Sequence, residues 1–261
     1  MKTLVMVNAL TSIESRAYSS HCIEWFAMGK EFGSKGELFI QHVQHRTSID
    51  RARNLAVQEA LLWDCEYLLF IDDDMILQPY TYRKLREADK DVVMAHSIIR
   101  GYPFDAMHFI DPTDKDFKSD KDYCDSLIHF NDYKEYTDPE TGLVRVDAIG
   151  CATVLFKTKI FKDIEPPWFV TLSNMTEDVY FCLKAQRRFG RKGIGIYVHT
   201  ECPTAHIMEP EIVYPNVVEK LRERAEEDDP QLIKNKDALK DRGTDYAQEL
   251  VDSFKEEEVP C

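Results

Sequence analysis

The 261-residue sequence contains no uninterrupted apolar run of the roughly 18–20 residues that a membrane-spanning helix needs. It contains no internal repeat and no low-complexity tract, which excludes a repeat architecture. The seven cysteines include no C-x2-C pair and are odd in number, which argues against a zinc site of that kind and against a disulfide framework. We therefore expect free thiols in a reducing compartment and a cytoplasmic location.

Positive charge is also scarce relative to negative charge, with 33 Lys+Arg against 47 Asp+Glu and a net charge of −14. Residues 209–261 carry a net −8, which leaves −6 for residues 1–208. This balance argues against broad nonspecific binding of nucleic acid, although a local basic groove remains compatible with it. We expect residues 209–261 to form an acidic, helical C-terminal extension of a main domain over residues 1–208.

Hydrophobic residues make up 44% of the chain and aromatic residues 11%, so wholesale disorder is excluded. The first residues, "MKTLVMVNAL", contain one lysine and a short apolar run that Asn8 interrupts. This pattern favours a first buried strand over a signal peptide.

Short apolar strands alternate with amphipathic helices through the first hundred residues. Strand patterns cover residues 2–8, 37–43, 66–71 and 91–99, and helix patterns cover residues 13–33, 48–64 and 80–88. In the first helix, the apolar stripe is expected to contain Ala17, Ile23, Phe26 and Ala27. The order β-α-β-α-β-α-β predicts an α/β fold with a mostly parallel sheet flanked by helices.

The middle of the chain, about residues 104–146, is polar, aromatic and poor in strand signals, so we expect a smaller mixed insertion that shapes a cleft. Its segment "DPETG", residues 138–142, is a turn signal between two extended runs and predicts a hairpin. Beyond it, "CATVLFKTKIF" predicts a further strand, and a helix is expected from Thr176 to Gly190.

Asp72, Asp73 and Asp74 follow directly after the buried-strand pattern "YLLFI". Ligands of open α/β sheets bind beyond the carboxyl ends of the strands. Three adjacent carboxylates repel one another there unless a cation is present. Asp72 and Asp74 point to the same side of an extended chain, and Mg2+ or Mn2+ prefers such oxygens. An isolated acidic triplet is commonly a solvated turn, but its position after a buried strand favours a metal site.

Two further features are weak when taken singly. Thr176 is placed to cap a helix whose first turn holds Glu177 and Asp178, and good capping chemistry alone would explain these residue types. His206, in "CPTAHI", follows a predicted strand, and a lone histidine is more often structural than functional.

Taken together, the motifs form an ordered set: "RARN" at a helix start, "LLFIDDDM", "GCATVLFKTKIF", "PPWF", "TEDVYFCLKA" and "AHI". This order resembles that of nucleotide-sugar glycosyltransferases of the GT-A fold, in particular the family-2-like enzymes of bacteria and phages. The resemblance covers roughly residues 1–208 and implies a Rossmann-like catalytic domain there. It also implies transfer of a sugar from a nucleoside-diphosphate sugar, with a UDP-sugar favoured, to an acceptor hydroxyl with the help of Mn2+ or Mg2+.

The resemblance implies roles for the acids and the late histidine. Asp72 and Asp74 match the D-x-D acids, with Asp74 on the metal and Asp72 on the metal or the ribose. His206 matches the histidine that completes metal coordination. Asp178 matches the base that deprotonates the acceptor in inverting members, with Glu177 in support.

The resemblance also implies nucleotide contacts. These would come from Asn8 and Leu10 after the first strand, from Arg53 and Asn54 at the "ARN" helix start, and from Asp73. The "GCATVLFKTK" segment lacks the second glycine or basic pair often found in the family, which leaves the acceptor side open.

On that side, Trp168 is a candidate to stack on a sugar or base, or to belong to the core. Arg187 and Arg188 either complement a helix C-terminus or contact a phosphate-bearing acceptor. One acceptor that the analogy suggests is a hydroxymethylated pyrimidine in phage DNA, beside saccharide, lipid-linked and protein acceptors. No protein partner is predicted, and a phage-encoded chain would act in the host cytoplasm.

Two other functions stay open. A metal-dependent nuclease or phosphohydrolase would use the aspartates in a two-metal site, which needs four or more converging acids. A non-catalytic nucleotide-sugar binding module would have no need of Asp178.

Overall fold

The structure is a computed structural model that describes residues 1–9, 12–45, 47–113, 119–208, 211–213 and 223. Contacts within the chain divide it into two units, Met1–Asn216 and Val217–Cys261, and every helix and strand with defined bounds belongs to the first. A short strand, Glu211–Val213, lies near the start of the predicted acidic extension. Leu10 lies outside the described residues. Of residues 209–261, the structure describes 211–213 and 223.

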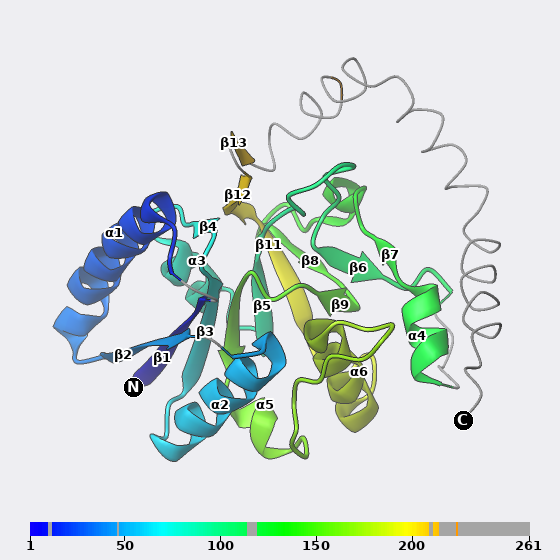
Figure 1. Ribbon diagram of the computed structural model, residues 1–261, viewed down its shortest axis with the longest axis horizontal. Helices are drawn as coiled ribbons and strands as arrows, with labels where there is room; N and C mark the ends of the chain where they lie inside the picture. The colour runs from blue at the N-terminus through cyan, green and yellow to red at the C-terminus, as the bar shows by residue number, and fades with distance from the viewer. Residues whose placement is uncertain (10–11, 46, 114–118, 209–210, 214–222, 224–261) are drawn as a thin grey trace, which may run out of the picture. The chain divides into compact units, whose positions relative to one another are not determined.

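A seven-stranded sheet in the order β2-β1-β3-β10-β5-β11-β8 forms the centre of the first unit (Figure 1). β1 pairs in parallel with β2 and β3, and β5 pairs in parallel with β11, whereas β10 and β8 run antiparallel to their neighbours. This arrangement confirms the predicted α/β class with a mostly parallel sheet. The strands are β1 (Lys2–Ala9), β2 (Leu38–His45), β3 (Tyr67–Asp72), β5 (Val92–His96), β8 (Leu143–Arg145), β10 (Thr153–Lys157) and β11 (Ile196–Pro203).

Helices cover both faces of this sheet, because successive side chains of each strand point to opposite sides. Met6 of β1 belongs to one core cluster together with Phe181, whereas its neighbour Val7 belongs to a second cluster together with Met28. The first cluster lies under α2 (Ile49–Leu62), α5 (Lys159–Lys162) and α6 (Glu177–Phe189), and the second under α1 (Ser15–Glu31) and α3 (Thr81–Glu87).

The buried face of α1 differs from the predicted apolar stripe. Phe26, expected inside, is 74% exposed, and the helix instead buries His21 and Glu24. Glu24 Oε1 accepts a hydrogen bond from Tyr82 N at 2.7 Å, and His21 Nε2 lies 2.9 Å from Met75 O. Backbone groups buried away from water require such partners, so α1 turns its polar side chains inward.

The predicted insertion contains a small antiparallel sheet, β7-β6-β9, and the short helix α4. Its elements are β6 (His108–Ile110), α4 (Asp120–Ser126), β7 (Ile128–His129), the 3-10 helix η2 (Tyr133–Tyr136) and β9 (Ala148–Ile149). The turn predicted at residues 138–142 is present, with Gly142 N donating to Asp138 O at 2.8 Å. The hairpin prediction is wrong, because η2 precedes the turn and β8 pairs with β11 at the edge of the central sheet.

An ion-pair network ties this insertion to the loop after α6. The Asp111 side chain is fully buried, and Arg191 Nη1 lies 3.2 Å from its Oδ2. The same guanidinium forms a bidentate pair with Asp147, at 2.7 and 2.8 Å. A buried carboxylate without a partner would be strongly unfavourable, so Arg191 stabilises the insertion.

Two histidines are buried where β5 meets the insertion. The ring centroids of His96 and His108 lie 5.5 Å apart, and both rings contact Tyr133. Burial lowers the pKa of His108 to about 3 and that of His96 to about 4, so both rings are neutral at neutral pH.

The six cysteines in the described part of the chain are free thiols. None of the helices described there combines the length and the hydropathy that crossing a bilayer requires.

We expect His108→Leu to reduce the acid sensitivity of the fold. The pKa of His108 lies below the value of about 6.5 in an unfolded chain, so unfolded protein binds more protons below pH 6.5 and stability falls as the pH falls. Between pH 7.5 and pH 5.0, this residue should account for a loss of about 2 kcal/mol in the wild-type free energy of unfolding. Urea unfolding of both proteins at the two pH values measures the difference.

Each protein is compared with itself at pH 7.5, because leucine also changes the packing at this position. An equal pH-dependent loss in wild type and variant would contradict a neutral, buried His108.

Candidate functional site

Strand pairing brings the acid triplet and His206 together at the carboxyl end of β3. The triplet forms the turn between β3 and β4, and β4 pairs antiparallel with β12, which places His206 opposite Met75. Ile207 N donates to Asp74 O at 2.9 Å and holds this register. The three strands of this small sheet are β4 (Met75–Ile76), β12 (Ala205–Met208) and β13 (Glu211–Val213).

The side chains of Asp74 and His206 are in direct contact, with Nε2 of the ring 3.2 Å from Oδ2 of the carboxylate. On the other side of the ring, Nδ1 lies 2.9 Å from Ile98 O. A carbonyl oxygen only accepts, so Nδ1 carries a proton and Nε2 is the nitrogen aimed at Asp74. Burial lowers the pKa of His206, but the hydrogen bond and charge of Asp74 outweigh it and the net pKa is raised.

Arg100 also contacts Asp74 and was not identified from the sequence. Its Nη1 donates to Asp74 Oδ2 at 2.6 Å, although the Arg100 side chain is 62% exposed. Burial acts to raise the pKa of Asp74, but His206 and Arg100 together hold it below its ordinary value. The sequence signal that could have identified Arg100 is its position. It follows the carboxyl end of β5, at the same edge of the sheet as the triplet.

Arg53 links Asp72 to Glu177 beneath this edge. The buried guanidinium places Nη2 3.2 Å from Asp72 Oδ1 and Nε 3.3 Å from Glu177 Oε1. Burial raises the pKa of Asp72 to about 7, opposed by Arg53 and reinforced by Asp74. Burial also raises the pKa of Glu177, again against the effect of Arg53. Arg53 therefore positions two acids and does not line the cavity described below.

Asp178 lies in the first turn of α6, whose predicted bounds are confirmed by the N-cap Thr176 and the C-cap Gly190. Its oxygens accept hydrogen bonds from Thr176 Oγ1, from Val179 N at 2.8 Å and from Cys151 N at 3.2 Å. The residue after Cys151, Ala152, accepts a hydrogen bond from Asp72 N at 2.9 Å. The start of β10 therefore places Asp178 close to the end of β3.

A cavity of about 460 Å³ opens beside the triplet, and its lining includes Asn8, Asp72, Asp73, Asp74, Arg100 and His206. The Asn8 side chain is 5% exposed, and neither its Oδ1 nor its Nδ2 has a hydrogen-bond partner among the described residues. Unpaired buried amides are costly, so an amide beside a cavity points to a ligand that satisfies it.

The Asp74–His206 pair fits one divalent ion. Neighbouring ligand atoms of an octahedral ion with bonds of about 2.1 Å lie about 3.0 Å apart, close to the 3.2 Å between these two donor atoms. The hydrogen bond from Nδ1 to Ile98 is the support that metal-binding histidines commonly have. In the described part of the chain, no three His, Cys, Asp or Glu side chains form an assembled metal site, because Asp72 turns to Arg53.

Asn54, predicted to contact the nucleotide, instead holds the loop that follows α5. Its Oδ1 accepts from Trp168 N at 2.8 Å and Phe169 N at 3.2 Å, and its Nδ2 donates to Phe169 O and Asp50 O. Its hydrogen-bonding groups are therefore used within the protein.

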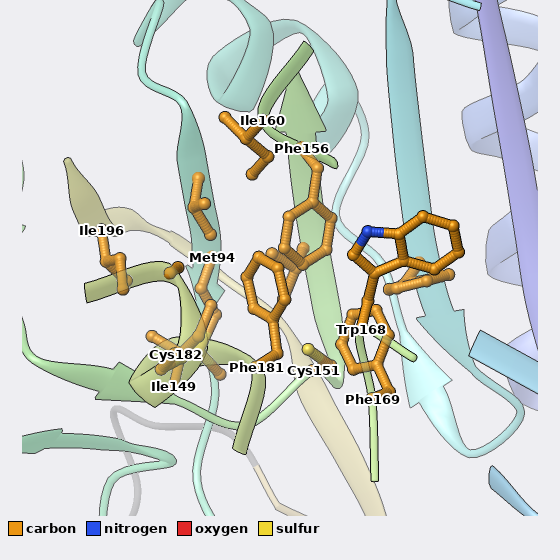
Figure 2. Close-up of a cluster of buried hydrophobic side chains, with 14 of the residues drawn as sticks. Met94, Ile149, Cys151, Phe156, Ile160, Trp168, Phe169, Phe181, Cys182 and Ile196 are labelled. Atoms are coloured by element: carbon orange, nitrogen blue, oxygen red, sulfur yellow. The ribbon is translucent and has the colours of Figure 1, made fainter. Parts of the chain in front are cut away.

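Trp168 belongs to the core, which was the second of the two alternatives for this residue. The ring is 6% exposed, and its Nε1 donates to Phe161 O and Ile164 O. Figure 2 shows Trp168 among buried side chains that include Phe156, Phe169 and Phe181.

Arg187 and Arg188 lie at the end of α6 opposite to Asp178, about 13 Å along the helix axis. Arg187 pairs with Asp120, and Arg188 Nε donates to Asp163 O at 2.7 Å. Neither lines the cavity described above, and both stand in the last turn of α6, where the first of the two alternatives placed them.

No protein-family model and no curated protein matches the chain. Among solved structures, A197 from STIV is 16% identical with a TM-score of 0.49, over 82% of this chain and 94% of that one. GalNAc-T7, solved with UDP, GalNAc and Mn2+, is 13% identical with a TM-score of 0.45, over 79% of this chain and 44% of that one. UDP-glucose pyrophosphorylase complexed with UDP-glucose is 9% identical with a TM-score of 0.42, over 77% and 90%. With TM-scores below 0.5, these similarities carry no argument about function.

We expect Asn54→Ala to lower stability without weakening nucleotide binding. Alanine leaves the backbone groups of Trp168 and Phe169 without partners, at a cost of about 2 kcal/mol. Thermal unfolding measures the loss, and titration with UDP and Mn2+ measures binding. Gln58→Ala, an exposed amide one turn further along α2, is the matched control. A large loss of nucleotide affinity at unchanged stability would instead restore the role predicted from the sequence.

Proposed function

We propose that the chain is a divalent-metal-dependent glycosyltransferase that moves a sugar from a nucleoside-diphosphate sugar to an acceptor hydroxyl. The observation that carries the proposal is the Asp74–His206 donor pair at the edge of a cavity that also contains the unpaired Asn8 amide. The volume of about 460 Å³ lies in the range of small-molecule sites.

Two groups that line the cavity suit different parts of such a donor. The Asn8 amide offers N–H donors and an acceptor oxygen, which complement a nucleobase edge or a ribose hydroxyl. Asp74 and His206 would hold the ion, with Asp72 and Asp73 beside them. When bound, the ion offsets the negative charge that develops on the departing diphosphate. The preference for a UDP-sugar comes from the resemblance described above.

In the proposed transfer, the acceptor oxygen forms a bond to the anomeric carbon while the bond from that carbon to the phosphate oxygen breaks. The nucleoside diphosphate leaves, and the hydroxyl proton passes to the carboxylate of Asp178. A positioned carboxylate contributes roughly 10²–10⁴-fold to such a step. The hydrogen bonds from Cys151 N and Val179 N orient Asp178, and Arg53 holds the neighbouring Glu177.

The acceptor is left open by this proposal. Arg187 and Arg188 were the basic residues considered for a phosphate-bearing acceptor, and their internal partners at the far end of α6 do not support modified DNA. The nuclease alternative needs four or more converging acids, and the described residues do not assemble even three metal ligands.

The proposal predicts that one nucleoside-diphosphate sugar raises the melting temperature, and does so only with a divalent ion. Ligands that bind only the folded state stabilise it by mass action. A thermal-shift panel of UDP-, GDP- and CDP-sugars, each with Mn2+ or with EDTA, measures the effect. If none of these nucleotide sugars raises the melting temperature in the presence of Mn2+, the proposal is refuted.

Asp74→Asn should abolish the metal-dependent shift, because it removes the charged donor that faces His206.

Asp178→Asn should keep the shift but lower the rate of sugar transfer or donor hydrolysis by about 100-fold or more. Full turnover in Asp178→Asn would remove this residue from the reaction. Intact donor binding without turnover on any acceptor would favour the binding module.

A further inference from the structure

One carboxylate oxygen of the site contacts two side chains. Asp74 Oδ2 accepts from Arg100 Nη1 at 2.6 Å and lies 3.2 Å from His206 Nε2. A carboxylate oxygen has two lone pairs, so these two contacts occupy both of them. An ion bound between Asp74 and His206 needs a lone pair of this oxygen, and it repels a guanidinium at the same position. The ion would take the lone pair that faces His206 and bring its charge beside the guanidinium, so cation binding weakens the Arg100–Asp74 contact.

The position of Arg100 keeps the free-energy cost of breaking its contact with Asp74 small. Arg100 lies in a short loop, directly after Ile99, whose N donates to Asp105 O at 2.9 Å, and near the bridge between Ile98 and Ala106. Its side chain is 62% exposed, and exposed ion pairs are weak. Breaking the contact with Asp74 therefore costs little free energy.

After displacement, the guanidinium remains at the cavity. Among the described residues of the lining, Arg100 is the sole arginine or lysine, facing Asp72, Asp73 and Asp74. A nucleoside diphosphate carries more negative charge than one divalent ion cancels, and an arginine fork matches phosphate oxygens in geometry and charge.

We propose that Arg100 is a phosphate-binding residue of the donor site, which rests on Asp74 in the absence of ligands and transfers to the diphosphate when the cation binds. This inference rests on the proposed function and names the part of the donor that Arg100 recognises. It assigns Arg100 two opposed effects, as a competitor of the cation and as a partner of the diphosphate.

The test is a pair of calorimetric titrations on wild type and Arg100→Gln. With MnCl2 alone, the variant should bind Mn2+ about two- to fivefold more tightly, because the competing guanidinium is gone. With UDP, and GDP in parallel, at saturating Mn2+, the variant should bind the nucleotide about tenfold more weakly or worse, because a charged hydrogen-bond partner is lost. Opposite signs in the two titrations distinguish this role from a general loss of structure, which weakens both.

Two control variants sharpen the result. Arg100→Lys keeps the charge but not the fork, so its diphosphate affinity should lie between those of wild type and Arg100→Gln. Arg83→Gln removes an arginine of α3 that pairs with Glu31 and does not line the cavity, and both affinities should stay at wild-type values.

The outcomes separate the two proposals. If wild type binds Mn2+ and nucleotide, Asp74→Asn abolishes binding and Arg100→Gln changes neither affinity, the role of Arg100 is overturned and the proposed function stands. If Arg100→Gln weakens both, Arg100 is structural and the inference also fails. If wild type binds neither Mn2+ nor UDP nor GDP, the proposed function falls and the inference falls with it.

Discussion

Electrostatic repulsion among the acids at the end of β3 is the constraint on which the rest of the site depends. Asp72 and Asp74 stand at one edge of the sheet, and Glu177 approaches from the first turn of α6. Arg53 forms ion pairs with Asp72 and Glu177. At Asp74, the charge of the carboxylate is balanced by contacts with His206 and Arg100. Burial still raises the pKa of Asp72 to about 7, and the neighbouring charges of Asp74 and Glu177 add to this effect. A positive charge close to Asp72 would favour its ionised form.

The antiparallel strand β10 explains how residues distant in the sequence reach this edge. It enters the sheet between β3 and β5 at the end where β3 leaves it, so its first residues lie beside Asp72. Ala152 bonds to Asp72, and Cys151 bonds to Asp178. A strictly parallel strand would present its amino end at the opposite edge of the sheet, and α6 would lose this connection to the acid triplet.

Local patterns were sufficient to predict the elements of the fold. The apolar run before Asp72 and the helix bounds at Thr176 and Gly190 each depend on a few neighbouring residues, and the structure has them where expected. The Thr176 side chain makes no capping hydrogen bond to the backbone and donates to Asp178 instead. Alternation of strands and helices then determines the class of sheet. The pairing of the strand after residues 138–142 was not predictable in this way, because the partner of β8 is β11, more than fifty residues further along the chain.

The failures within the site have the same origin. Asn54 belongs to a motif-like helix start, but its partners are Trp168 and Phe169, which the sequence does not identify. The buried face of α1 is determined by hydrogen bonds between its side chains and the backbone of Tyr82 and Met75. Hydrophobic periodicity does not show these bonds, so it placed Phe26 on the wrong side of the helix. Arg100 belongs to no motif, and its contact with Asp74 becomes evident only in the structure.

The pairing of β4 with β12 has a consequence for biosynthesis. Asp74 and His206 are separated by 132 residues, and the register between these strands brings them together. The residues of β1, β2 and β3 are translated long before the histidine. A nascent chain that ends before His206 lacks half of this pair, so the chain completes the pair only when almost all of its first unit has been made.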